Sequence, residues 1–340
     1  MAFFSSRNTL QDKYYGLPST LLFAVGVLGN IIALAILWKN KLNRKENKKS
    51  VFYYLATGLT IVNLTGKIMV CPVVLDAYLK NRTLVQINGS HSLCHYFGFG
   101  MICFGLAQTL ILLGMALDCW LAIARPFIYR KHITKKVGFL VPVTSCIFSL
   151  GFCSMPFFGI GKFVQYCPGT WCFIDMKSSE PRHLAYSVMY GTFMGVLVIT
   201  TVLLNVDIMR CLYKLHRRQS RRKVIGTKAG HDPINGKQAG MEELDHLVLL
   251  AVMTVVFVVC SLPLTARVYM GAFTNDANEY YDVIVLRLVS SNSIVDPWVF
   301  IIFRTSAFHM LTNCLHCRFQ QKKKTQPTDG KGNTLNYAYI

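Results

Sequence analysis

The sequence predicts an all-α membrane protein, a bundle of seven transmembrane helices. Of its 340 residues, 53% are hydrophobic and only 15% are charged, whereas a soluble domain carries roughly a quarter of charged residues. Seven apolar stretches are long enough to cross a bilayer, and most basic residues lie between them. This pattern excludes a disordered chain. It also disfavours a nucleic-acid-binding protein, whose basic residues are spread through a polar fold. We therefore expect membrane lipid around the chain and no nucleic acid.

Each predicted span is an α-helix, because a lone segment in lipid has no other way to satisfy its backbone hydrogen bonds. About 20 residues, each rising about 1.5 Å, cover the hydrocarbon layer. The first run lacks a basic flank and a small-residue cleavage site, so we expect no cleavable signal peptide. The spans are predicted at Leu17–Trp38, Val51–Leu79, Tyr96–Ala124, Gly138–Ile160, Leu184–Met209, His246–Met270 and Asp282–Phe303.

The charge distribution predicts the orientation of the bundle. The chain holds 36 Lys and Arg against 16 Asp and Glu, a net charge of +20. Of those 36 basic residues, 26 lie in four segments, 39–50, 125–136, 210–237 and 304–340. Because basic loops stay in the cytoplasm, we expect a multi-pass protein of the cell membrane. Its expected parts are an extracellular N-terminus at 1–16, a seven-helix domain at 17–303 and a cytoplasmic tail at 304–340.

The glycosylation sequons agree with this orientation. Asn81-Arg82-Thr83 and Asn88-Gly89-Ser90 fall in a loop predicted to be outside, which makes Asn81 and Asn88 candidate acceptors. A third match begins at Asn63 but lies inside a span, so we discard it.

Five cysteines carry separate expectations. Cys94, Cys167 and Cys172 lie on the predicted oxidising side, where Cys94 can pair with either of the other two. Cys314 and Cys317 follow the last span beside basic residues, a context typical of palmitoylation. Plain free thiols are the alternative there.

Ionisable residues inside a span are costly and mark candidate functional sites. Arg287 lies about five residues below the outer end of the last span, too deep to be solvated. Its guanidinium either binds a ligand carboxylate in an outer pocket or pairs structurally with an acid such as Asp76. Lys67 lies midway along the second span, where it indicates a polar pocket, or a neutral lysine or one bonded to backbone carbonyls. Arg267 and Asp207 lie near span ends and can reach the membrane interface.

Asp296-Pro297 and Asp118 are candidates for a conformational switch near the inner ends of the last and third spans. Proline frees a backbone carbonyl, so we expect a break and a hinge in the last helix. The alternative is a kink with a hydrated or capped carboxylate. No Ser-His-Asp arrangement, HExxH zinc motif or GxxxxGK phosphate loop is present, so we expect no enzyme, no metal and no cofactor. A transporter would be expected to show repeated halves, and no internal repeat is apparent.

Several motifs together resemble one receptor family. Gly29-Asn30 in the first span, Cys94 at the start of the third and Asp296-Pro297 in the last resemble rhodopsin-like G-protein-coupled receptors. The outer segment 165–174, QYCPGTWCFI, is more specific and resembles the signature of prostanoid receptors, as does Leu286-Arg287. Within that family, three motifs resemble those of the receptors for prostaglandin D2: Asp118-Cys119-Trp120-Leu121, the segment 127–134 and Gly161-Lys162-Phe163-Val164.

The resemblance implies a receptor that binds prostaglandin D2 and signals through Gs to raise cAMP. A Gs-coupled receptor for prostaglandin E2 or prostacyclin is the alternative. It also implies a short cytoplasmic amphipathic helix after the seventh span, a disulfide between Cys94 and Cys172, and Cys167 as the odd thiol.

The ligand contacts that the resemblance implies fall on five positions. Arg287 corresponds to the arginine that binds the prostanoid carboxylate, and Tyr78 to a tyrosine near the same group. Thr170 and Trp171 correspond to contacts from a hairpin lid. Lys67 would help select the ring or approach the acid chain.

Two departures from the common receptor pattern bear on activation. Asn63 stands where most such receptors carry an aspartate, so we do not expect ordinary sodium-dependent regulation. Asp118 is followed by Cys119 and not by the usual arginine, so the common ionic lock cannot form.

Overall fold

The computed structural model describes residues 16–43, 51–89, 91–166, 169–224, 233–274 and 279–304. The expected thiol Cys167, the palmitoylation candidates Cys314 and Cys317 and the expected helix after the last span lie outside the described residues. Of Asn88, the backbone alone is described.

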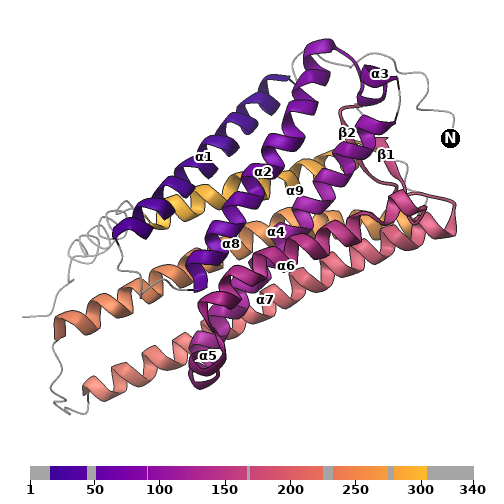
Figure 1. Ribbon diagram of the computed structural model, residues 1–340. Helices are drawn as coiled ribbons and strands as arrows, with labels where there is room; N and C mark the ends of the chain where they lie inside the picture. The colour runs from indigo at the N-terminus through magenta and orange to yellow at the C-terminus, as the bar shows by residue number, and fades with distance from the viewer. Residues whose placement is uncertain are drawn as a thin grey trace, which may run out of the picture. The chain divides into compact units, whose positions relative to one another are not determined.

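Within the described residues, seven helices are long and apolar enough to cross a membrane. They run side by side in one bundle (Figure 1), which confirms the predicted seven-helix fold. α4 is the most buried of the seven and contacts α2, α6 and α7. The seven are α1 (Gly16–Asn43), α2 (Val51–Lys80), α4 (Ser92–Ala124), α6 (Lys135–Cys153), α7 (Pro181–Val224), α8 (Pro233–Phe273) and α9 (Glu279–Arg304).

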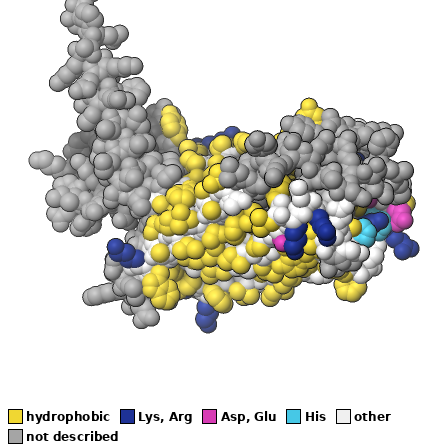
Figure 2. All heavy atoms as spheres, turned by 90° about the horizontal axis from the view of Figure 1, so that it is seen from above, with side chains coloured by type: hydrophobic (Ala, Val, Ile, Leu, Met, Phe, Trp, Pro, Cys, Tyr) yellow, Lys and Arg dark blue, Asp and Glu magenta, His cyan; other side chains and the backbone are white. Residues whose placement is uncertain are grey.

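The surface of the bundle is apolar, as a membrane protein requires. Hydrophobic side chains form a broad band over the face seen in Figure 2, with few charged groups within it. Large apolar side chains such as Phe139 (63% exposed), Ile147 (64%) and Leu203 (64%) lie open on this kind of surface. In water such exposure would be unfavourable, whereas in lipid it has no such cost.

Three helix boundaries differ from the predicted spans. α6 ends at Cys153, not at Ile160, because Pro156 cannot continue the hydrogen-bond ladder. A short 3₁₀ helix, η2 (Met155–Phe158), follows, and Gly159 at φ 83° ends it. α7 and α8 are longer than their spans, with 44 and 41 residues, since the hydropathy signal ends where the polar, basic segment begins. Two short helices were not predicted, α3 (Leu84–Asn88) and α5 (Pro126–His132).

A β-hairpin lies against one end of the bundle, which we call the hairpin end. β1 (Phe163–Tyr166) pairs antiparallel with β2 (Trp171–Ile174), with Tyr166 opposite Trp171. Gly169 adopts φ 98° in the turn, a backbone conformation that favours glycine. The Cys94–Cys172 disulfide fastens β2 to the start of α4, with 5.4 Å between the Cα atoms, as the resemblance implies.

Candidate ligand-binding site

A cavity of about 120 Å³ lies beside the hairpin, between α1, α2, α4, α9 and β2. It brings together Lys67, Arg287 and Trp171, three of the residues that the sequence singled out. Most of the remaining lining is apolar or hydroxyl-bearing, and no Asp or Glu is among it. The site therefore has two cationic side chains and an apolar wall. The other lining residues are Ser19, Leu22, Phe23, Val70, Cys71, Val74, Leu75, Phe97, Met101, Ser290, Ser291 and Ile294.

Lys67 is held by α9. Its side chain is buried (5% exposed), and Nζ donates to the Ser290 carbonyl oxygen at 3.1 Å and lies 3.4 Å from Ser290 Oγ. The Lys67 side chain thus bonds a backbone carbonyl, as one of the alternatives had it, and also lines a largely apolar cavity. A second cavity of about 50 Å³ continues past Lys67 into the bundle and shares it as a wall.

Arg287 lies on α9, three residues before Ser290, so their Cα atoms are about one helical turn apart, or about 4.5 Å along the axis. The guanidinium is half-buried and lines the cavity. Asp76, the acid considered as a structural partner, is absent from the cavity lining and accepts a hydrogen bond from Lys80 at 2.8 Å. Arg287 and Lys67, whose Nζ bonds Ser290, both line the cavity, which makes it suited to an anion.

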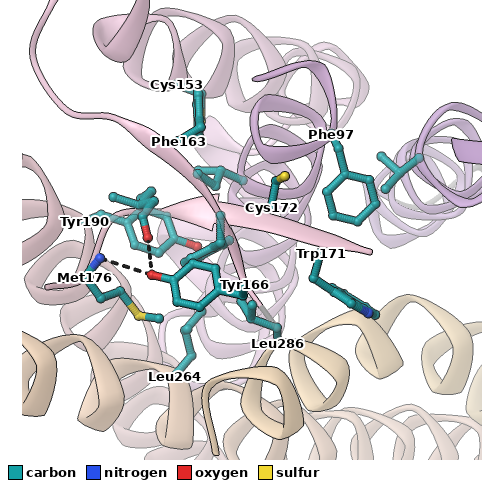
Figure 3. Close-up of a cluster of buried hydrophobic side chains, with 14 of the residues drawn as sticks. Phe97, Cys153, Phe163, Tyr166, Trp171, Cys172, Met176, Tyr190, Leu264 and Leu286 are labelled. Carbon is teal, nitrogen blue, oxygen red and sulfur yellow. Dashed lines mark hydrogen bonds between the residues drawn. The ribbon is translucent and has the colours of Figure 1, made fainter. Parts of the chain in front are cut away.

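Trp171 closes the cavity from the hairpin. Its indole is 8% exposed and meets the Phe97 ring edge-to-face, with centroids 5.8 Å apart. Figure 3 shows the indole nitrogen turned away from the apolar cluster of the hairpin. Within the described part of the chain this buried N–H has no hydrogen-bond partner. Buried donors normally have one, so Trp171 offers a donor to whatever occupies the cavity.

Tyr78 and Thr170 adjoin the site without lining it. Their hydroxyl oxygens lie 3.3 Å apart, which ties the hairpin turn to the end of α2. Thr170 is fully buried. The hairpin itself is held by Tyr166, whose hydroxyl donates to the Ile174 carbonyl at 2.7 Å and accepts from the Met176 amide at 3.2 Å (Figure 3).

Two of the switch candidates lie together in the middle of the bundle. Asp296 is 2% exposed and accepts a hydrogen bond from Gln108 Nε2 at 2.7 Å, and the Asn63 side chain lies beside it. Gln108 was not anticipated, because a lone glutamine in an apolar span gives no signal by itself.

Asp118 lies apart from this cluster. It is buried and hydrogen-bonds Tyr129 of α5. Burial raises the pKa of the Tyr129 hydroxyl, and the nearby Asp118 charge raises it further.

The expected break at Pro297 is wrong, because α9 runs unbroken from Glu279 to Arg304. Proline deprives the carbonyl four residues earlier, that of Ser293, of its helical donor. Asn30 Nδ2 of α1 donates to that carbonyl at 3.1 Å and to the Gly26 carbonyl at 2.8 Å. The side chain of α1 therefore replaces the missing hydrogen bond, and the helix continues.

Sequence reasoning also missed a buried ion cluster at the hairpin end. Asp282 is 1% exposed and accepts from Arg267 Nη2 at 2.7 Å and from Lys177 Nζ at 2.9 Å. Arg267, expected at the membrane interface, is instead 7% exposed. The available signal was an acid at the start of the last span, level with a cation at the end of the previous one.

The comparisons with known proteins agree with this architecture. Residues 29–300 match the family described as "7 transmembrane receptor (rhodopsin family)". Squid rhodopsin has a similar fold, with a TM-score of 0.69 at 15% identity over 96% of this chain and 89% of that one. The prostaglandin D2 receptor of Homo sapiens is 46% identical over 317 residues, 88% of each chain.

Two further relatives point to the same group. The prostaglandin D2 receptor-like protein of Rattus norvegicus is 47% identical over 86% of each chain. The prostaglandin E2 receptor EP2 subtype of Canis lupus familiaris is 40% identical over 88% of this chain and 85% of that one. These proteins are receptors and not enzymes, as expected for this chain too. The chain belongs to the prostanoid receptors, within the rhodopsin family of seven-transmembrane G-protein-coupled receptors.

Proposed function

We propose that this receptor binds prostaglandin D2 at the outer face of the cell membrane and signals through Gs to raise cAMP. The observation that carries the proposal is the cavity in which Lys67, Arg287 and Trp171, whose indole N–H has no hydrogen-bond partner among the described residues, share an apolar lining without an acid. A prostanoid is a fatty acid with a polar ring, and it requires an apolar slot, a fixed cation and a few polar groups. The ligand class therefore matches the chemistry of the cavity.

The proposed roles follow the positions of the side chains. Arg287 binds the carboxylate, for which its planar fork is suited. Lys67, deeper in the bundle, contacts the chain or the ring. Trp171 and Thr170 form part of the hairpin lid, and Tyr78 holds Thr170 near the carboxylate.

Prostaglandin D2 is preferred over prostaglandin E2 as the ligand because of the relatives. Identity to receptors named for prostaglandin D2 is 46–47%, against 37–40% to those named for prostaglandin E2. A receptor for prostaglandin E2 or prostacyclin remains the second candidate, since its ligand would have the same carboxylate and a different ring.

In the proposed orientation the hairpin end is extracellular. Asn81 and Asn88, the glycosylation candidates, both lie in the α2–α4 connection beside the hairpin. The 26 basic residues of the four basic segments then face the cytoplasm. Asp118, Asn63, Asp296 and Pro297 are the proposed switch residues, between the ligand cavity and the G protein.

The test is displacement of labelled prostaglandin D2 from transfected-cell membranes by prostaglandins D2, E2, I2 and F2α, together with agonist-driven cAMP. Tighter binding of another prostanoid would overturn the subtype, and no cAMP rise on saturating prostaglandin D2 would overturn Gs coupling. Lys67→Met is expected to change the ratio of prostaglandin D2 to E2 affinity more than it changes surface expression. Lys80→Met, at the exposed end of the same helix, is the matched control and should leave that ratio unchanged.

Arg287→Ala tests the carboxylate contact directly. A bidentate pair of charge-assisted hydrogen bonds is worth about 3 kcal/mol, so affinity for the free acid should fall about 100-fold. Affinity for the methyl ester, which has no carboxylate, should fall much less. Arg82→Ala removes the same charge from an exposed turn and should change neither affinity. Equal loss for acid and ester would mean that Arg287 is structural.

A further inference from the structure

A second hollow lies on the outside of the bundle, between α7 and α8, and we call it the α7–α8 groove. It has a volume of about 650 Å³. It shares no lining residue with the cavity that holds Lys67 and Arg287. The prostanoid site therefore does not account for it.

The walls of the groove are apolar and open to the bilayer. Val255 is 63% exposed, Val259 59%, Met209 52% and Val206 40%. The polar groups at its floor are satisfied by each other, because Asn205 Nδ2 donates to Thr254 Oγ1 at 2.6 Å. Over this length the groove therefore offers apolar surface, which suits an acyl chain.

One end of the groove is basic. Arg210, Tyr213 and Lys214 line it, and all three are exposed. Arg210 and Lys214 are four residues apart and so lie on one face of α7. The acid next to them in sequence, Asp207, points elsewhere, since it accepts a hydrogen bond from Trp120 Nε1 of α4 at 2.7 Å. The cations in the groove thus have no carboxylate among the groove's lining residues.

The basic end coincides with the boundary of the membrane. The apolar span of α7 ends at Cys211, and Arg210 lies about 43 Å along the helix from its first residue, Pro181, at the hairpin end. The segment 210–223 holds seven Lys and Arg. A basic cluster just past a span attracts anionic lipid, by about 1 kcal/mol for each cation.

We propose that the α7–α8 groove binds an anionic glycerophospholipid, with one acyl chain along the valine walls and the phosphate between Arg210 and Lys214. Tyr213 lies at the level of the glycerol ester groups. The lipid comes from the cytoplasmic leaflet, in the orientation proposed above, while the ability to bind it does not depend on that orientation or on the prostanoid ligand. A groove that both α7 and α8 line is filled best in one arrangement of the two helices, so the bound lipid stabilises that arrangement.

The experiment counts bound lipid on the full-length receptor, purified in detergent and titrated with palmitoyl-oleoyl-phosphatidylserine. Native mass spectrometry gives the lipid bound, and thermal unfolding gives the stabilisation. We expect the receptor to retain one phosphatidylserine molecule and its melting temperature to rise. With palmitoyl-oleoyl-phosphatidylcholine we expect less retained lipid and a smaller rise. Two lost cations predict a fall in phosphatidylserine affinity of about 30-fold in Arg210→Gln/Lys214→Gln.

Two further variants separate the groove from general charge. Val255→Phe fills the apolar wall without changing charge and should also displace the lipid. Arg130→Gln/Lys131→Gln removes the same charge from exposed positions on α5 and should retain it. Three results would each overturn the proposal. The first is retention of phosphatidylcholine equal to that of phosphatidylserine, and the second is an equal loss of affinity in the α5 and α7 variants. The third is unchanged affinity in both groove variants. If inorganic phosphate or oleate raises the melting temperature as much as phosphatidylserine does, the choice of a phospholipid is overturned.

Discussion

Single hydrogen bonds decide whether the last helix of the bundle stays continuous. The Ser293 carbonyl lies four residues before Pro297, which has no N–H to give it. Asn30 of α1 donates to that carbonyl instead, at 3.1 Å. Because Asn30 is fully buried, no water competes with the bond. The Gly29-Asn30 motif of α1 and the Asp296-Pro297 motif of α9, read separately in the sequence, are therefore two halves of one contact.

Asn30→Ala should reduce the free energy of unfolding by about 1–3 kcal/mol, the usual result of leaving a buried carbonyl unpaired. The melting temperature of the purified receptor measures this. Pro297→Ala supplies a backbone N–H to Ser293, so Asn30→Ala should cost less in that background. Equal losses in the two backgrounds would show that Asn30 acts through some other contact.

At the scale of elements, the hairpin lid depends on a close approach at Gly98 of α4. A Cβ atom there would lie 2.7 Å from Cδ1 of Phe163. This carbon belongs to a rigid ring, so it cannot move aside as the end of a flexible side chain could. Neighbouring residues of α4 carry the disulfide at Cys94 and the Phe97 ring that packs on Trp171. The missing side chain at Gly98 thus lets β1 and β2 pack against α4 beside the ligand cavity.

Gly98→Ala should lift β1 and weaken prostanoid binding several-fold while the Cys94–Cys172 disulfide stays intact. Phe163→Ala in the same chain should restore part of the affinity by making room. Gly151→Ala is the matched control, because a Cβ at Gly151 meets nothing within 4 Å. Radioligand saturation on the native receptor and the three variants measures the effect, and unchanged affinity in Gly98→Ala would show that the lid does not depend on this contact.

The ion cluster at the hairpin end joins three elements. Asp282 lies in the first turn of α9, Arg267 lies in the last two turns of α8, and Lys177 lies between β2 and α7. Asp282→Ala leaves the buried Arg267 guanidinium without its carboxylate, which should cost about 3–5 kcal/mol of unfolding free energy. Lys177→Ala should cost less, because its side chain is 27% exposed. Thermal unfolding distinguishes them, and a larger effect of Lys177→Ala would contradict this account.

Hydropathy predicted where the helices lie better than where they end. The seven spans follow from composition alone, because lipid imposes one length and one polarity on each. The end of α6 at Cys153 depends on Pro156 and a local turn, and the length of α7 depends on a basic helix that leaves the membrane. Such ends are set by hydrogen bonds and not by apolar content.

At the scale of the molecule, the candidate site was predictable in part because charge is rare in spans. Lys67 and Arg287 stand out in the sequence as lone cations, and the structure places both at one cavity. Their neighbours could not be found that way. Ser290, the partner of Lys67, is 223 residues away in sequence, and Arg267 was misplaced because a cation near a span end can be solvated or buried with equal ease.

The centre of the bundle offers a test of how α2, α4 and α9 are coupled. Asn63, Gln108 and Asp296 lie together, with a single carboxylate among the three and Gln108 Nε2 donating to it at 2.7 Å. The Asp296 carboxylate accepts from Gln108 at Oδ2 and offers a cation a single negative charge, because its other neighbour, Asn63, is a neutral amide. We therefore expect the melting temperature of the native receptor to be the same in sodium chloride as in choline chloride at equal ionic strength.

Asn63→Asp places a second carboxylate beside Asp296, and two such groups in a buried site repel each other. Sodium bound between them would relieve that repulsion, so the variant should unfold at a lower temperature in choline and recover in sodium. Asn63→Leu is the matched control, because it removes the amide without adding charge and should show no difference between the salts. A sodium-dependent melting temperature in the native receptor would contradict the first expectation, and its absence in Asn63→Asp would mean that positions 63 and 296 do not bind a cation together.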